Sequence, residues 1–530
     1  MARAGSLKTA DAVPLWGPWD GIHREVPPAS IPDKGFYDAW NVVLTEGRIQ
    51  PRPGFRLSTR YTNTDTDPLS LFEILRDRGG VEYPIKGNSD FTAGTLGVSY
   101  WDGAAWSSLV VGLGTSRDTP PVLLPFKDEG LLLPGDGELH KWTPSGPSLV
   151  TVDSLQPNTE LRPPDKARFI ATTASRVFLA NGIEPGGSER YPYRVWWSTT
   201  LNSNIWSNGT GDIGRGSASY QDLQHDTYPI TGLHFHSGQF VMAFKTWSIY
   251  IGQWRGSPVW YDFVPITTRV GCIAGKTIRQ YQDTVLFLGS DLNVYMLGAR
   301  GKLQPVGLPV QDYLQGIVDF SKANRAVGLV DHDESLYWLV VPTTAHGSEQ
   351  ARHLLCLDLS TGAWTEGATA VSTLQVLHGT YGYFVGSGSV IFWGSEDGKL
   401  YEYDVASPMR DAGTQWEAYV WSKVYDFMEI FGGRQPLASE GEIHKVSIHG
   451  SEGTCTPRVR VGRTVQDIES ATPTTFSEID QAATDSIPYV SERTFSERFA
   501  QWGLVWPVGT TTPTPVDGVA VWTLPRGGTR

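Results

Sequence analysis

The feature that most constrains the fold is a strand–turn–strand pattern that recurs between about residues 60 and 405. Each copy has an apolar run, a short turn rich in Gly, Asp or Ser, and a second run in which aromatic and apolar residues alternate. This pattern is typical of β-hairpins. Five copies carry it, at 131–142, 240–251, 286–297, 333–340 and 392–403.

The copies recur at a nearly constant spacing. The aromatic residue of the second run gives intervals of 45 residues from Tyr250 to Tyr295 and 42 from Tyr295 to Tyr337. The interval from Tyr337 to Tyr401 is 64, which we interpret as one period plus an extra hairpin at 353–366. A repeat of about 40 to 50 residues made of short strands matches a four-stranded propeller blade. The sequence therefore predicts an all-β fold with a β-propeller of about six or seven blades, an N-terminal arm and hairpin, and an additional small C-terminal β domain.

The length and composition fit such a chain. At 530 residues the protein exceeds a single compact core, and its 12% aromatic residues with 58 Gly and 35 Pro favour sheets joined by tight turns. One short helix is expected, at 309–315. The predicted segments are an extended N-terminal arm (1–35), a hairpin that launches the propeller (36–60), the β-propeller (61–410), a β-sandwich-like domain (411–507) and a C-terminal arm or strand (508–530).

The hairpin segment has a Pro-rich exit. Residues 40–44 read as a strand, Gly47 supplies a residue for a positive φ, and 48–50 starts the return strand. Pro51 and Pro53 lack a backbone N–H, so the return strand should end there or lie at an edge. Gly54 would then redirect the chain.

Arginines and tryptophans near the N-terminus are the candidate structural residues. Arg48, Arg52 and Arg56 recur along the hairpin segment, around Pro53 and Gly54. We interpret these arginines as ion-pairing struts at a blade seam or a subunit interface. In the arm, Trp16 and Trp19 should hold the chain against its own domain or a neighbour, because large aromatic groups favour burial.

The charge and the cysteines exclude several classes of protein. A net charge of −13 argues against a basic nucleic-acid-binding surface, although DNA could still slide past an acidic wall. Cys272, Cys356 and Cys455 are an odd number without a paired motif, so buried free thiols are expected. No apolar stretch reaches the roughly 20 residues of a membrane span, and no secretory signal opens the sequence.

Motifs for catalysis, cofactors or metals are missing from the sequence. It contains no nucleophile elbow, phosphate-binding loop or dinucleotide fingerprint. The acidic clusters at 331–334 and 395–398 read as turns, and His234 and His236 share one strand face without a third ligand. We therefore predict no enzyme activity, cofactor or metal site. Residues 100–106 could stack on sugars, or could simply form two blade strands and their turn.

One resemblance points to a function. Residues 39–44 (AWNVVL), 46–49 (EGRI) and 52–54 (RPG) resemble the start of tailed-bacteriophage virion proteins in which a long propeller follows. The resemblance is close over the hairpin and loose over the repeats at 60–405.

The resemblance implies a structural protein, most similar to the tail nozzle or hub (tubular tail protein) of short-tailed phages. Such a protein is made in the host cytoplasm and built into the virion. Six copies would surround the DNA exit channel below the head-to-tail adaptor, strapped together by their terminal arms, with fibre, spike or needle proteins docked outside. The alternatives are a minor tail protein, or a receptor- or glycan-binding propeller protein, of a tailed phage.

Overall fold

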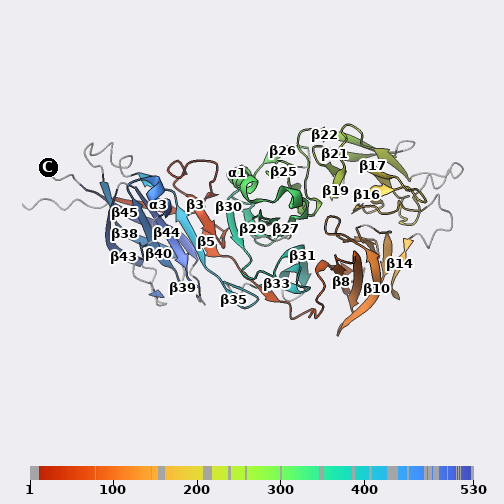
Figure 1. Ribbon diagram of the computed structural model, residues 1–530, viewed down its shortest axis with the longest axis horizontal. Coiled ribbons are helices and arrows are strands. Elements are labelled where there is room, and N and C mark those ends of the chain that lie inside the picture. The colour runs from red at the N-terminus through yellow and green to blue at the C-terminus, as the bar shows by residue number, and fades with distance from the viewer. Residues whose placement is uncertain are drawn as a thin grey trace, which may run out of the picture.

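The computed structural model consists of a β-propeller and a two-sheet β-sandwich, which lie side by side (Figure 1). It describes residues 11–526, apart from 78, 136, 145, 153–161, 207–217, 237–239, 257–259, 299–300, 345–350, 385–387, 405–408, 427–439, 451–452, 471–473, 476–479, 482–488, 498, 509, 511–512 and 514.

Within the described residues the propeller has seven antiparallel blades of four strands each. The first three are β7 (Leu69–Arg76), β8 (Glu82–Asp90), β9 (Thr95–Trp101) and β10 (Trp106–Gly114); β11 (Val122–Phe126), β12 (Glu129–Leu133), β13 (His140–Thr143) and β14 (Gly146–Thr151); and β15 (Phe169–Thr172), β16 (Val177–Ile183), β17 (Arg190–Trp197) and β18 (Ser219–Asp222).

The other four blades follow the same order. They are β19 (Ile230–His236), β20 (Phe240–Lys245), β21 (Ile249–Gly256) and β22 (Trp260–Thr267); β23 (Arg279–Tyr281), β24 (Thr284–Leu288), β25 (Val294–Gly298) and β26 (Leu303–Pro305); β27 (Val327–Asp331), β28 (Leu336–Pro342), β29 (Ala351–Asp358) and β30 (Trp364–Ala368); and β31 (Val376–Phe384), β32 (Gly388–Ser395) and β33 (Leu400–Asp404), completed by β6 (Gly54–Leu57).

Apolar clusters fill the seams between neighbouring blades and close the ring. At the last seam Leu69 and Phe72 of the first blade pack with Phe384 and Phe392 of the seventh, and the rings of Phe72 and Phe392 lie 5.0 Å apart. The fourth strand of the seventh blade is β6, from the start of the chain, which pairs antiparallel with β33. The ring is therefore held shut by a strand that precedes its first blade.

The blades explain the one irregular interval in the sequence. Tyr250, Tyr295 and Tyr401 lie on the third strands of their blades, whereas Tyr337 lies on the second strand, β28. The interpretation of 353–366 as an extra hairpin is wrong, because this stretch forms β29 and β30, the regular third and fourth strands of the sixth blade.

The sandwich is built from both ends of the chain. One sheet has the order β4 (Val42–Thr45), β5 (Arg48–Pro51), β45 (Val516–Arg526), β38 (Glu440–Gly450) and β43 (Tyr489–Glu497), with β1 (Asp11–Trp16) also on β45. The other contains β3 (Gly35–Trp40), β36 (Ala418–Ser422), β44 (Phe499–Trp506), β40 (Thr456–Gly462) and β41 (Thr474–Thr475). Phe36, Leu44, Trp502 and Val519 share its apolar core.

The terminal segments predicted as arms differ from that expectation. Strand β1 pairs with β45 of its own chain, from Asp11 opposite Thr523 to Trp16 opposite Gly518. Strand β45 in turn pairs with β38. Strand β45 thus has partners on both sides, whereas β1 has β45 as its one described partner strand and lies at the edge of the sheet. Residues 1–10 and 527–530 of the predicted arms lie outside the described part.

The hairpin prediction holds for its turn and fails for its first residues. The turn between β4 and β5 has positive φ at Glu46 (51°) and Gly47 (78°), the geometry of a two-residue hairpin turn that glycine favours. Trp40, however, belongs to β3, because Asn41 with φ 54° separates β3 from β4.

The sandwich continues the edge of the sixth blade. The outermost strand of that blade, β30, pairs in parallel with β2 (Gly21–Ile22) and β3, through Gly21 opposite Trp364 and Trp40 opposite Glu366. An exposed strand edge would recruit other chains, and here the sandwich covers it. Helix α1 (Leu308–Ile317) agrees with the helix expected at 309–315 and is somewhat longer.

Candidate functional site

The junction between sandwich and propeller holds two clusters of buried polar groups, and Arg52, one of the predicted arginines, belongs to the first of them. Arg48 forms an ion pair of 2.7 Å with Asp517 at the surface. Arg56 forms one of 3.1 Å with the buried Glu402 of β33. Each arginine therefore joins the N-terminal hairpin segment to a strand from a distant part of the chain.

Arg52 is the most deeply placed of the three. Its guanidinium makes two hydrogen bonds to Asp411, from Nη1 to Oδ1 at 3.0 Å and from Nη2 to Oδ2 at 2.6 Å. Both side chains are buried, at 1% and 0% exposure. The group also donates to Asn41 Oδ1 at 3.1 Å and to the Ala368 carbonyl at 3.0 Å. The ring of Trp416 covers it at 4.3 Å.

Asp411 and Asn41 extend this polar cluster to three chain segments. Asp411 lies in β34 (Arg410–Asp411) and also accepts hydrogen bonds from the backbone N–H groups of Phe55 and Ala370. Asn41 accepts one from Ala368 N–H and donates one to the Glu417 carbonyl. The positive φ of Asn41 turns its side chain into this cluster, which fixes the exit of the sixth blade to the start of the sandwich.

The remaining predicted residues have simpler places. Pro53 accepts a hydrogen bond from Arg52 through its carbonyl, and Gly54 begins β6 opposite Asp404. Trp19 is buried at 1% exposure and stacks on Phe36 at 5.4 Å, so it holds the N-terminal segment against its own sandwich. The backbone of Trp16 ends β1, and its side chain lies outside the described residues.

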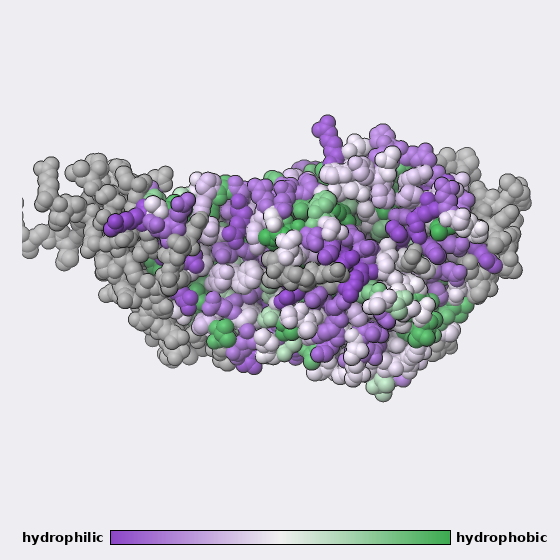
Figure 2. Space-filling view, viewed as in Figure 1, coloured by the Kyte–Doolittle hydropathy of each residue, from purple (hydrophilic) through white to green (hydrophobic). Residues whose placement is uncertain are grey.

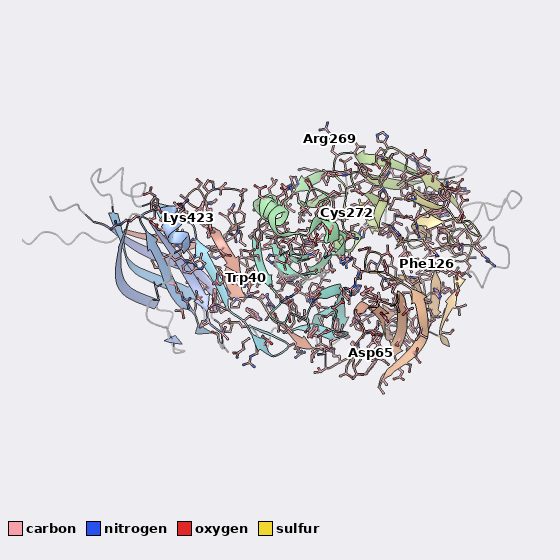
Figure 3. All side chains as sticks on the ribbon, viewed as in Figure 1. Trp40, Asp65, Phe126, Arg269, Cys272 and Lys423 are labelled. Atoms are coloured by element: carbon pink, nitrogen blue, oxygen red, sulfur yellow. The ribbon has the colours of Figure 1, made fainter. Side chains whose placement is uncertain are left out.

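A second buried polar cluster surrounds Glu366. Arg24 Nη2 lies 2.6 Å from Glu366 Oε1 and 3.4 Å from Asp38 Oδ1. His353 Nε2 lies 3.5 Å from the other oxygen of Glu366. The ring of Tyr313 on α1 lies 5.1 Å from the Arg24 guanidinium. Trp40, whose ring is 5.8 Å from that of His353, lies where the sandwich meets the propeller (Figure 3).

The pKa values of the two carboxyl groups in this cluster, those of Asp38 and Glu366, shift in opposite directions. Burial and the neighbouring Glu366 raise the pKa of Asp38 to about 7. Burial alone would raise the pKa of Glu366 too, but His353 and Arg24 outweigh it and hold that pKa well below its usual range. Two acids that share one cation cannot both ionise easily, so Asp38 is the member that keeps a proton near neutral pH.

Sequence reasoning missed this cluster. Arg24 and Glu366 are 342 residues apart, and each occupies an ordinary polar position in its own segment. The signal that could have found it is weak. Glu366 lies in a blade strand whose other described residues are mostly apolar or small, where a charge without a partner would be costly.

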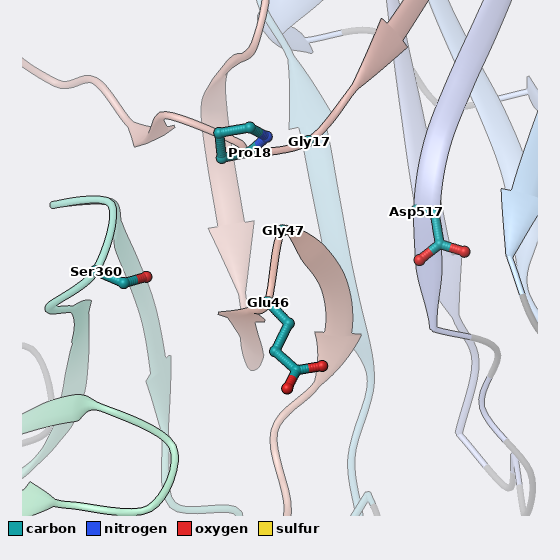
Figure 4. A pocket seen from close by; sticks show the side chains of 6 residues that line it. All are labelled: Gly17, Pro18, Glu46, Gly47, Ser360 and Asp517. Carbon is teal, nitrogen blue, oxygen red and sulfur yellow. The ribbon is translucent and has the colours of Figure 1, made fainter.

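A shallow hollow of about 420 Å³ opens beside this junction (Figure 4). It is lined by Gly17, Pro18, Glu46, Gly47, Ser360 and Asp517. Asp517 is the partner of Arg48, and the Ser360 hydroxyl donates to Asp358 within its own turn. The hollow thus offers backbone, hydroxyl and carboxylate groups.

Several other groups that the sequence brought forward have ordinary structural surroundings. The described residues contain no cluster of three or more metal-ligating side chains. Asp331 accepts the N–H groups of Asp333 and Glu334, as a turn residue does. The three cysteines are buried and free, and burial raises the pKa of Cys272 to about 12. Cys272 lies among the inner strands of the propeller (Figure 3).

Two further observations concern the hydropathy of the surface and of the helices. In Figure 2 the visible face is a mixture dominated by hydrophilic residues, with hydrophobic ones in small groups. No helix in the described part of the chain is long and apolar enough to cross a membrane.

Comparison with known proteins supports the fold alone. No protein-family model matches the sequence, and no curated protein matches it. Among solved structures, virginiamycin B lyase from Staphylococcus aureus is similar at 12% identity and a TM-score of 0.40, over 66% of this chain and 98% of that one. The WD40 domain of Neurospora crassa Pan2 is similar at 12% identity and a TM-score of 0.37, over 66% and 94%. The chain is therefore similar to propeller proteins, and likeness at this level carries no argument about activity.

Proposed function

We propose that this protein is a structural component of a tailed-bacteriophage virion, a ring-forming nozzle or hub below the head-to-tail adaptor that conducts DNA and docks fibres or spikes. The resemblance of residues 39–54 to the start of such proteins motivates the proposal. The observation that carries it is the buried Arg52–Asp411 pair, because it gives the resembling residues a mechanical role.

That role is to make two domains act as one rigid piece. The hairpin β4–β5 lies in the sandwich, β6 closes the propeller, and Arg52 between them is bound to Asp411 and Ala368. Polar groups buried with all partners in place fix a single geometry. A part that bears load during DNA ejection needs such a fixed geometry and no cofactor. The net charge of −13 would limit adhesion of passing DNA.

The experiment is electron cryomicroscopy of the purified full-length protein and of particles that contain it. We expect a closed ring of copies around a channel wide enough for duplex DNA, at the exit of the particle. A protein that stays monomeric at all concentrations and is absent from particles would contradict the proposal.

An exposed aromatic group favours glycan binding as a second candidate function. Trp254 on β21 is 50% exposed, and its ring is backed by Trp260 and Tyr261 at 5.4 Å each. A rigid, exposed indole offers a flat face for the apolar side of a sugar ring. By contrast, Trp101 and Trp106, the sugar-stacking candidates from the sequence, pack on Tyr61. A glycan array probed with wild-type protein and a Trp254→Ala variant tests this, and an array without signal removes it.

A further inference from the structure

The axis of the propeller gathers basic side chains that the proposed function does not use. The first strand of each blade lies innermost, and these strands or the turn before them carry Glu73 (β7), His234 (β19), Lys276 (η3, Gly275–Thr277), Arg279 (β23) and His378 (β31). These five residues come from four blades, the first, fourth, fifth and seventh, and face one region.

Lys276 and Arg279 are brought together by the same neighbouring strand. Lys276 Nζ donates to the Leu377 carbonyl at 2.5 Å, and Arg279 Nη2 lies 3.4 Å from the Gly379 carbonyl. Carbonyl groups two residues apart on a strand point to the same side. The ammonium and the guanidinium therefore lie next to each other along β31.

The described partners of both cations are backbone carbonyls, not carboxylates. Arg279 also donates to Gly328 O at 2.8 Å and to Ile278 O at 3.3 Å. The carboxylate close to them, Glu73, is engaged by His378 at 3.1 Å and by Thr380 at 2.8 Å. Two cations and a histidine thus share one carboxylate, in a protein whose net charge is −13.

The electrostatics of the axis reflect this excess of positive charge. Burial and the nearby Arg279 lower the pKa of Lys276 to about 7. Burial lowers the pKa of His378 as well, and Lys276 and Arg279 add to that effect against Glu73. Charges removed from water without a counter-ion are costly. Solvent still reaches the site, because the Glu73 side chain is 29% exposed.

The cations also have donors to spare. Of the three N–H groups of a lysine, Lys276 uses one on Leu377. Of the five of an arginine, Arg279 uses three on carbonyls. Two donors on each group remain for a ligand that carries several acceptor oxygens. Carboxylate and phosphate geometry suits a guanidinium in particular.

We propose that Lys276 and Arg279 form an axial anion site that binds a small oxyanion of sulfate or phosphate geometry. The anion would supply the missing counter-charge to the two cations of the fifth blade, where they lie against β31 of the seventh. This inference does not rest on the proposed function, since it concerns each single propeller.

The test is a titration of the purified full-length protein with sodium sulfate against sodium chloride at equal ionic strength. Sulfate keeps one charge state from pH 6 to pH 8.5, so any change with pH belongs to the protein. At pH 6 we expect a saturable rise of the unfolding temperature in the wild type. The affinity should fall about tenfold by pH 8.5, as Lys276 loses its proton.

The variants are Lys276→Met and, as a matched control, Lys302→Met, which changes an exposed lysine between β25 and β26. The control should bind sulfate like the wild type, and Lys276→Met at least fivefold more weakly. Equal binding by both variants, or a rise that never saturates, would overturn the proposal, because salt exclusion acts on every variant alike.

A measurement on the wild type covers the case in which Lys276→Met does not fold. Crystals grown or soaked with selenate should show an anomalous difference peak within hydrogen-bond reach of Lys276 Nζ and Arg279. Absence of that peak at a selenate concentration that saturates the thermal shift would also overturn the assignment.

Discussion

Arg52 and Asp411 lie 359 residues apart in the sequence and form a two-pronged ion pair with both side chains buried. The pair joins the strand that closes the propeller to the segment that enters the sandwich. Together with the parallel pairing of Asp411 with Phe55, it fixes how the two domains are oriented.

Replacing Arg52 by alanine should leave Asp411 buried without its cation. Breaking a buried pair in this way costs about 3–5 kcal/mol, so the urea midpoint of unfolding should fall markedly. Arg48→Ala is the matched control, because its pair with Asp517 is about half exposed and is worth about 1 kcal/mol or less. Similar midpoints for both variants would show that the Arg52 pair does not hold the junction.

Strand β6 gives a second pair of variants. Phe55 is buried at 1% exposure and packs on Trp393 and Tyr403, whereas Leu57 on the same strand is 46% exposed. Phe55→Ala should destabilise the fold by about 3–5 kcal/mol, and Leu57→Ala by about 0.5 kcal/mol or less. Thermal unfolding measures both. Limited proteolysis should then cut first near the seventh blade of Phe55→Ala, and uniform cutting would argue against a closing role for β6.

Asp38 should make stability depend on pH. Its pKa in the folded protein is about 7, above the value near 3.9 of an unfolded chain. The folded state therefore binds more protons between about pH 4 and pH 7, and its contribution to stability is lost as the pH rises through that window. Asp38→Asn keeps the neutral form at every pH, so the variant should gain stability relative to wild type between pH 5 and pH 8.

Glu366 should have the opposite effect on the pH dependence of stability. Its pKa is held below the usual range, so its contribution is present above about pH 4.5 and lost in acid. Glu366→Gln should lower stability at pH 7, because Arg24 loses its partner at 2.6 Å. Chemical denaturation at several pH values separates the two effects. A wild type and an Asp38→Asn variant with parallel pH profiles would refute the assignment of the proton to Asp38.

The three cysteines should not react with thiol reagents in the native protein. Cys272, Cys356 and Cys455 are buried, and burial raises the pKa of each thiol. Reaction requires the exposed thiolate. A colorimetric thiol assay should therefore count close to none before denaturation and three after it. Rapid labelling of one thiol in the native state would reveal local opening around that residue.

The sequence was sufficient to predict the propeller, because each blade is made of strands and turns that local sequence patterns indicate. Alternating runs and turn residues mark individual blade hairpins, and the spacing of Tyr250 and Tyr295 gives their period. The same logic misplaced Tyr337, since the second and third strands of a blade have similar patterns. The phage resemblance and the ring of copies stay predictions.

The polar junction could not be predicted in the same way. The partners Arg24 and Glu366, or Arg52 and Asp411, are brought together by the closure of the whole fold. Nothing in the immediate sequence of either partner records the other. The terminal strands show the same limit, because β1 and β45 each read as an arm that could have paired with any edge.

The closing strand has a consequence for how the protein is made. Strand β6 leaves the ribosome before any blade, yet its partner β33 is among the last strands of the propeller. Strand β1 can pair only after β45, which is synthesised later still, near residue 520. The ring can therefore close only after β33 has been made, and the sandwich only after β45. Synthesis that stops early yields open sheets, which keeps incomplete copies out of any assembly that requires the finished junction.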